Sequence, residues 1–174
     1  MAIRKILKFP DQDLRIKAKP VESFDEELKT LTDDMFETMH SVNGIGLAAT
    51  QIGVAKQVAV IDISPEKNEP LVIVNPEIQI LDPSKTEDYD EGCLSVPGFF
   101  EKISRPSDIK LTYQDLNGKK QEIKPEGLLT KVVQHELDHL NGRLFVDHIS
   151  ELKRRRIRNK IVTVSYTHLT LPTI

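Results

Sequence analysis

Two histidines four residues apart, within residues 134–139 (QHELDH), constrain this chain more than any other feature. On a helix, side chains at this spacing lie on one face, one turn above the other. His135 and His139 can then bind one divalent metal ion, and Glu136 lies beside them, where it can take a proton from a bound water. The stretch therefore predicts a metal site with its own general acid/base on a single helix.

The residues around this stretch also predict a helix. Pro125 precedes it and Asn141-Gly142 follows it, as expected at a helix start and a helix stop. Apolar residues recur between them at helical spacing: Leu128, Leu129, Val132, Val133, Leu137 and Leu140. A helix that is apolar on most sides is buried, and its polar groups need a partner such as a metal. The alternative is a surface helix with two histidines by accident, which the apolar flanks disfavour.

The length and composition are those of an ordinary soluble globular protein. The 174 residues suit one domain, with 39% apolar and 29% charged residues. The net charge of −3 gives no reason to expect DNA binding, no apolar run is long enough to span a membrane, and the N-terminus lacks a secretory signal. The single cysteine, Cys93, permits no intrachain disulfide and fits a reducing cytosol, so we expect a cytoplasmic protein.

The pattern along the whole chain predicts an α+β fold. We expect mixed, mostly antiparallel β-sheets packed around the central HExxH helix, with an N-terminal helix and a C-terminal helix. Residues 1–162 are expected to form one domain that begins with an irregular arm over residues 1–22. The outer helices are predicted at Ser23 or Asp25 to Val42 and at Glu151 to about Val162, and the strands at Gln57–Ile63, Leu71–Val74, Ile78–Leu81, Ile109–Leu116, Lys119–Lys124 and Arg143–Ile149.

Two segments outside the helices have compositions that need an explanation. Residues 44–51 (GIGLAATQ) contain two glycines and two alanines, which leaves the backbone open to a ligand, although a tight helix–strand connection would look the same. Cys93 lies in residues 91–97 (EGCLSVP), and a lone buried cysteine is most often a small apolar residue. Two histidines, however, leave a catalytic metal one protein ligand short of the usual three, which makes Cys93 a candidate third ligand.

The C-terminal part of the chain contains a basic run. Residues 153–156 (KRRR), together with Arg158 and Lys160, lie on the last predicted helix, where they form either a solvated face or a binding surface. The final stretch, residues 163–174, is rich in threonine and has no helical pattern. We expect this atypical tail to be disordered or non-native.

Three stretches together resemble, in order and spacing, the three motifs of bacterial peptide deformylase. They are residues 44–51 (GIGLAATQ), 91–95 (EGCLS) and 134–139 (QHELDH). The similarity extends from about Ile3 to Lys160. The resemblance implies a single deformylase-like catalytic domain over residues 1–162.

The resemblance gives a role to each residue that matches a motif. The family's metal ligands correspond to Cys93, His135 and His139. Glu136 matches its general acid/base, and Gln51 and the backbone N–H of Leu94 match its oxyanion donors. Gly46 matches a residue that meets the substrate backbone. The pocket for the first side chain of the substrate corresponds to Ile45, Leu128 and Val132.

The resemblance also implies an activity. The family acts in the bacterial cytosol, where it removes formate from the N-formylmethionine of nascent peptides. Its metal is usually Fe²⁺, and Zn²⁺, Ni²⁺ or Co²⁺ can occupy the site. Members of its Gram-negative-like class end in a helix that can contact the ribosome, which would give the basic run a function. Residues 163–174 depart from that helical end.

Two other functions remain open on the residues alone. A zinc endopeptidase would use His135 and His139 with a distant carboxylate, whereas EGCLS favours a thiolate as the third ligand. A non-catalytic binding module would use the basic run as its working surface and would need no metal.

Overall fold

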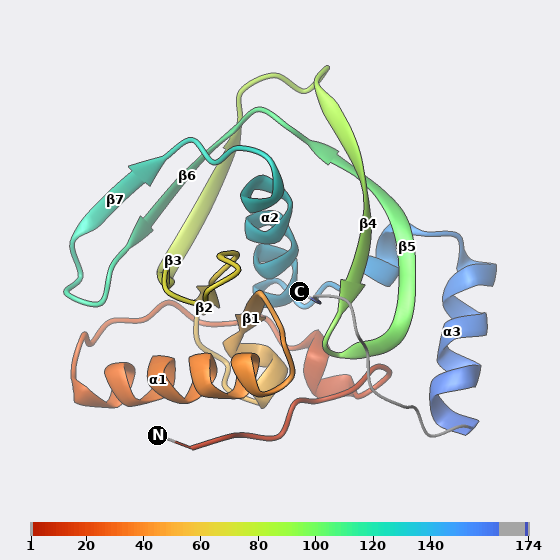
Figure 1. The fold of residues 1–174 in the computed structure, drawn as a ribbon, viewed down its shortest axis with the longest axis horizontal. Helices are drawn as coiled ribbons and strands as arrows, with labels where there is room; N and C mark the ends of the chain where they lie inside the picture. The colour runs from red at the N-terminus through yellow and green to blue at the C-terminus, as the bar shows by residue number, and fades with distance from the viewer. Residues whose placement is uncertain (1, 164–172, 174) are drawn as a thin grey trace.

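This computed structural model describes residues 2–163 and residue 173 (Figure 1). Its strands form antiparallel sheets, and its helices lie in other parts of the chain and do not alternate regularly with the strands. The predicted α+β class is therefore confirmed. In chain order the elements are η1 (Gln12–Arg15), α1 (Glu26–Ser41), β1 (Gly46–Ala48), η2 (Ala49–Ile52), β2 (Val58–Ile61), β3 (Leu71–Ile80), β4 (Thr86–Cys93), β5 (Val96–Pro106), β6 (Ile109–Gln114), β7 (Lys120–Ile123), α2 (Leu128–Leu140), η3 (Phe145–His148) and α3 (Glu151–Thr163), where η marks a 3-10 helix.

One helix packs on each face of the larger sheet. Its strand order is β1-β2-β3-β6-β7, and every neighbouring pair is antiparallel. Val58 and Val60 of β2 lie in one buried cluster with residues of α1, whereas Ala59 and Ile61 lie in another with Val132 of α2. Successive side chains of a strand point to opposite faces, so α1 and α2 cover opposite faces of β1 and β2.

The β4–β5 hairpin places the single cysteine. Its strands are joined by a two-residue turn directly after Cys93, which pairs with Val96. The strand register shifts between Glu91 and Cys93. Gly92 lies in this irregularity, where a Cβ atom would come within 2.4 Å of the Phe100 ring. Figure 1 shows α2 between this hairpin and the larger sheet.

The N-terminal arm connects two segments that are far apart in the sequence. The Leu7 N–H donates to the Gln51 carbonyl, and the Phe9 N–H donates to the Ser95 carbonyl, each at 2.8 Å. The side chain of Leu14 is buried, as is that of Phe9. The arm therefore covers part of the core and holds η2 beside the β4–β5 turn.

The strand predicted at residues 143–149 is wrong. Phe145–His148 forms the short helix η3. The Asp147 carboxylate accepts a hydrogen bond from the Leu144 N–H at 3.0 Å, which favours a turn over an extended backbone. A run of apolar residues predicted the strand, but the local side-chain hydrogen bond stabilises a different backbone.

The predicted boundaries of other strands also differ from the structure. The strands predicted at 71–74 and 78–81 are one strand, β3, because an irregularity between Val74 and Glu77 accommodates the intervening proline. Neither β4 nor β5 was expected as a strand. β4 has the acidic sequence TEDYDEGC, which lacks the Val and Ile enrichment used to predict strands.

The C-terminal helix lies where the sequence places it. α3 ends one residue beyond the predicted Val162, and the Ser150 hydroxyl accepts from the Lys153 N–H at 3.2 Å. Of the predicted tail, Thr163 ends α3 and Thr173 is described, whereas residues 164–172 and 174 lie outside the described part of the chain. None of the helices within the described residues has the length and apolar character needed to cross a bilayer.

Packing between α1 and the sheet should contribute strongly to stability. Met39 is fully buried in the cluster that contains β1 and β2 residues, so Met39→Ala should lower the free energy of unfolding by about 2–5 kcal/mol. Urea denaturation measures this change. Leu152→Ala, at a side chain that is 57% exposed, should change it by about 0.5 kcal/mol or less. Equal losses in the two variants would contradict this account of the core.

Candidate active site

Three ligand atoms from two distant segments meet beside α2. The Cys93 Sγ lies 3.2 Å from His139 Nε2, which lies 3.1 Å from His135 Nε2. All three side chains are buried, and their ligand atoms lie within 4.8 Å of one another. Within residues 2–163 and 173, no other group of His, Cys, Asp and Glu side chains has the geometry to hold a metal. The structure thus brings together the three residues predicted as ligands.

The environment of these groups fits a cation. Burial raises the pKa of the Cys93 thiol, and the Glu136 and Glu91 carboxylates raise it further. Burial also lowers the pKa of His139 well below its ordinary value, and His135 adds to this effect. A neutral imidazole is the form that binds a metal, and a divalent cation would favour the thiolate over the thiol. One sulfur and two nitrogen donors suit Zn²⁺, Fe²⁺ and related ions.

Glu136 lies in the same water-excluded space. It is fully buried, and neither carboxylate oxygen has a hydrogen-bond partner among the described residues. Burial raises its pKa well above the ordinary carboxyl value, and the Glu91 carboxylate adds to the increase. An unpartnered buried carboxylate is costly, so this group is suited to accept a proton or a hydrogen bond from a molecule that enters the site.

A buried carboxylate fixes the orientation of the His135 ring. The Nδ1 atom lies 2.9 Å from Glu91 Oε1, so an Nδ1–H that donates there leaves the Nε2 lone pair facing Cys93 and His139. Burial alone would raise the pKa of Glu91, but hydrogen bonds from His135 and Arg105 outweigh it and hold that pKa below its ordinary value. Arg105 itself is buried.

Sequence reasoning did not assign roles to Glu91 and Arg105. The EGCLS stretch contains Glu91, and the rule that a ligating histidine usually donates its second ring N–H to a carboxylate was the available signal. For Arg105 the sequence contains no comparable signal, because its partners, Glu91 and Asp138, lie 14 and 33 residues away.

Gln51 and the turn after β4 line the space beside the thiol. Gln51 is fully buried, and its Oε1 accepts from the Ala48 N–H at 2.9 Å. Its Nε2 donates to Ser95 Oγ at 3.0 Å and lies 3.6 Å from Cys93 Sγ. Leu94 directly follows the cysteine in the same turn and is 5% exposed. Both predicted oxyanion donors thus belong to segments that adjoin the ligand group.

The segment that enters β1 pairs with Thr173 along the edge of the larger sheet. β1 is an edge strand of the larger sheet, and edge strands expose unpaired backbone groups. The Ile45 N–H donates to the Thr173 carbonyl at 2.9 Å, and Gly44 forms a parallel bridge with Thr173. This part of the chain therefore accepts an additional extended segment. The residues predicted to line the substrate pocket pack in one cluster: Ile45, Leu128 and Val132.

Comparison with known proteins adds an independent finding to this geometry. The family model described as polypeptide deformylase matches residues 3–155. The chain belongs to the polypeptide deformylase family. It is 58% identical over 161 residues to a peptide deformylase from Saccharophagus degradans, with 92% of this chain and 93% of that protein covered. A peptide deformylase from Cellvibrio japonicus is 56% identical over 161 residues, with 92% and 95% covered.

Solved deformylase structures have the same fold. The crystal structure of a peptide deformylase from Legionella pneumophila gives a TM-score of 0.87 at 52% identity and covers 92% of this chain and 94% of its own. A peptide deformylase from Ehrlichia chaffeensis in complex with actinonin gives a TM-score of 0.87 at 40% identity, with 92% and 96% covered. The deformylase resemblance seen in the three sequence motifs is thus confirmed.

The close contact between β1 and α2 at this deformylase site can be tested at one glycine. A Cβ atom at Gly46 would lie 2.5 Å from Glu136 Oε1 and 2.9 Å from Val132 Cγ1, so Gly46→Ala should displace the carboxylate. A displacement of about 1 Å can cost ~10²-fold in rate, and we expect a loss of that order in kcat/KM.

The control for Gly46→Ala is the metal content, which the substitution should leave unchanged because the three ligands are not displaced. Formate release and elemental analysis of the same preparation measure both quantities. Wild-type kcat/KM in this variant would contradict a role for the close approach of Gly46 to Glu136.

Proposed function

We propose that this chain removes the formyl group from the N-formylmethionine of nascent peptides and releases formate. The observation that carries the proposal is the convergence of Cys93, His135 and His139 beside the buried carboxylate of Glu136 in a member of the deformylase family. A zinc endopeptidase would need a distant carboxylate as third ligand, whereas the side chain that lies beside the two histidines is Cys93, which supports the deformylase ligand set. A binding module without catalysis would have no use for an unpartnered buried carboxylate.

The proposed cofactor is one divalent metal ion, held by Cys93, His135 and His139. We propose Fe²⁺ in the cell, with Zn²⁺, Ni²⁺ or Co²⁺ as possible occupants, because the ligand set suits several divalent ions and availability decides among them. When bound, the ion supplies Lewis-acid chemistry, which makes water a stronger acid and polarises the formyl oxygen.

Glu136 moves the protons in this proposal. It accepts a proton from the water that attacks the formyl carbon, and it later donates that proton to the amine that leaves. Burial raises the pKa of Glu136, which favours the protonated form that is needed for the second step. The absence of competing hydrogen-bond partners among the described residues leaves both oxygens available for these transfers.

Gln51 and Leu94 are proposed to stabilise the charge that develops. When water attacks, the formyl oxygen becomes negative, and the Gln51 amide N–H and the Leu94 backbone N–H would donate to it. Both donors belong to segments fixed by the N-terminal arm, so little reorganisation is needed. Removal of one such donor typically costs ~10²–10³ in turnover.

The substrate peptide is proposed to bind as an added strand. Its backbone would bond to the segment around Ile45 and Gly46, in the way the Thr173 carbonyl accepts from the Ile45 N–H. The methionine side chain would enter the apolar cluster formed by Ile45, Leu128 and Val132. The small formyl group would then point to the ligand group.

The proposal also covers the domain organisation, the cellular compartment and the binding partners. We propose that residues 1–162 form a single catalytic domain in which α2 is the central element, and that the protein acts in the cytoplasm, where nascent peptides are made. No DNA or membrane partner is proposed. The basic surface described next suggests a ribosomal partner.

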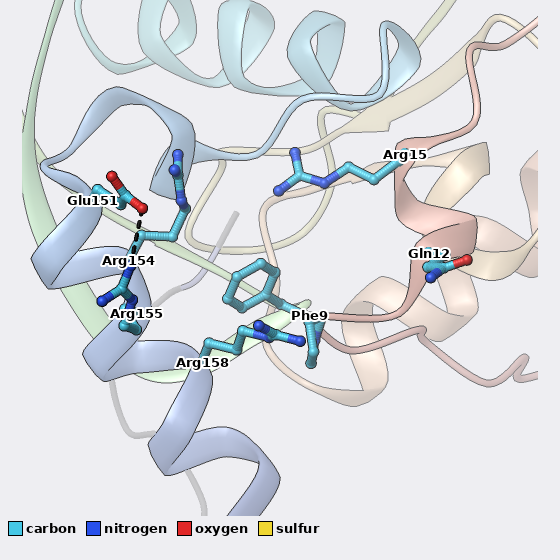
Figure 2. A pocket seen from close by; sticks show the side chains of 8 residues that line it. Phe9, Gln12, Arg15, Glu151, Arg154, Arg155 and Arg158 are labelled. Atoms are coloured by element: carbon cyan, nitrogen blue, oxygen red, sulfur yellow. Dashed lines mark hydrogen bonds and ion pairs between the residues drawn. The ribbon is translucent and has the colours of Figure 1, made fainter.

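A basic hollow lies between the N-terminal arm and α3. It has a volume of about 410 Å³ and is lined by Phe9, Pro10, Gln12, Arg15, Glu151, Arg154, Arg155 and Arg158. Figure 2 shows Arg15 of the arm and Arg158 of α3 on different sides of the Phe9 ring. Arginine is suited to phosphate recognition, so we propose that this surface contacts the ribosome, which would bring the enzyme close to emerging chains.

The proposed chemistry makes a direct prediction for Glu136. Glu136→Gln removes the proton carrier and preserves the three metal ligands, so formate release from a formyl-Met tripeptide should fall by ~10²–10⁴-fold or more while metal content stays unchanged. Enzyme prepared anaerobically with Fe²⁺ and aerobically should be compared, and a chelator should abolish activity in both.

An internal peptide bond serves as the control substrate for Glu136→Gln and the wild type. The wild-type enzyme should not cleave it, whereas an endopeptidase would. Full deformylation by Glu136→Gln with confirmed metal content would remove Glu136 from the mechanism.

The ribosomal proposal predicts a charge effect separate from catalysis. Neutralising Arg154, Arg155 and Arg158 to Gln should weaken co-sedimentation with ribosomes by about ten-fold or more, and the difference should shrink at high salt. Deformylation of a short peptide should not change. Neutralising Lys119, Lys120 and Lys124, which lie in and beside β7, is the matched control. If both triple variants co-sediment equally, α3 is not the docking surface.

A further inference from the structure

One buried guanidinium joins the two segments that carry the metal ligands. Arg105, on β5, is 4% exposed. Its Nε and Nη2 donate to Glu91 Oε2 and Oε1 at 2.5 and 2.9 Å, and its Nη1 donates to Asp138 Oδ2 at 3.0 Å. Glu91 is two residues before Cys93 on β4, and Asp138 directly precedes His139 on α2. The two carboxylates therefore adjoin ligands on different elements.

One of these two carboxylates also contacts a proposed ligand ring, and the other contacts a histidine of η3. Glu91 Oε1 is also the partner of His135 Nδ1, at 2.9 Å. On the other side, Asp138 Oδ2 accepts from His148 Nε2 at 2.9 Å, so η3 supports the second carboxylate. A displacement of Arg105 would thus move the His135 ring through two successive hydrogen bonds, which share Glu91, and would move Asp138, the residue before His139 on α2, through one.

We propose that Arg105 is a positioning residue that holds Cys93, His135 and His139 in their metal-binding arrangement before the metal enters. The inference rests on the proposed metal site and goes beyond it, because it concerns a residue that touches neither metal nor substrate. A planar guanidinium with fixed N–H directions can bind two carboxylates at once, which a lysine ammonium cannot do with the same geometry. Partners that orient ligating histidines typically contribute 10–100-fold to metal affinity.

A simpler explanation is that Arg105 only ties β4 to α2 for stability. The structure contains a natural comparison for this explanation. Lys131 of α2, which is 6% exposed, donates to Glu87 of β4 at 2.6 Å, and neither of these side chains hydrogen-bonds to the side chain of Cys93, His135 or His139. Lys131 links α2 to β4 directly, and Arg105 links the same two elements from β5, but only the Arg105 network includes a hydrogen bond to a proposed ligand, His135.

The test compares Arg105→Met, Arg105→Lys and Lys131→Met, each loaded with Co²⁺. The rate of Co²⁺ loss to a chelator and the Co²⁺ absorption spectrum, including the thiolate charge-transfer band, report on the site, and urea denaturation of the metal-free proteins reports on stability. We expect Arg105→Met to lose Co²⁺ about 10–100-fold faster, with an altered spectrum. Arg105→Lys should be intermediate, and Lys131→Met should lose Co²⁺ at the wild-type rate whatever its stability.

A double-variant comparison tests the route through Glu91. Because Arg105 acts on His135 through this carboxylate, Arg105→Met should accelerate Co²⁺ loss less in a Glu91→Gln background than in the wild type. Where Arg105→Met does not fold, Arg105→Lys takes its place in this comparison. Fully multiplicative effects on the rate of Co²⁺ loss would overturn the proposed route.

The outcomes separate this inference from the metal site on which it rests. Wild-type rates of Co²⁺ loss in both Arg105 variants, or an equal acceleration in Lys131→Met, would overturn the positioning role and leave the metal site intact. If Cys93→Ala also loses Co²⁺ at the wild-type rate and keeps the same spectrum, the proposed metal site fails, and the role of Arg105 fails with it.

Discussion

Cys93 Sγ and the Nε2 atoms of His135 and His139 lie together in a buried space, where a cation would be bound by all three atoms at once. Burial drives the thiol towards its protonated form and His139 towards its neutral form. Metal binding therefore couples to proton release from the thiol. The rest of the structure brings these atoms together and shields them from solvent.

The proposed ligands come from two elements that are far apart in the sequence. The thiol is at the closed end of the β4–β5 hairpin, and both rings are on α2, which the larger sheet supports from the other side. The N-terminal arm binds the Gln51 and Ser95 carbonyls and so fixes the two segments that adjoin the thiol. α1 packs on the face of β1 that is opposite to α2, and this packing keeps Gly46 close to Glu136.

Local patterns were readable from the sequence, and long-range ones were not. The periodicity of α1 and α2 and the spacing of His135 and His139 depend on residues a few positions apart, and the chemistry of a metal site pointed to Cys93 as the missing ligand. β4 is a strand because β5 pairs with it, although its own composition is acidic. Arg105 has a role because Glu91 and Asp138 reach it from other elements, and no pattern near residue 105 indicates this.

The charges around α2 also explain why a divalent ion suits this site. Arg105 is matched by Glu91 and, in part, by Asp138, which His148 also contacts. In the proposed metal-bound state, the Cys93 thiolate and the Glu136 carboxylate would be two negative charges in this region. Lys8 interacts electrostatically with Cys93, and Arg105 with Glu136, so they offset part of this charge. A doubly charged ion would balance the rest. In the proposed mechanism, Glu136 would lose its negative charge by accepting a proton while another negative charge develops on the formyl oxygen. The local charge would then stay balanced in a region where an unbalanced charge is costly.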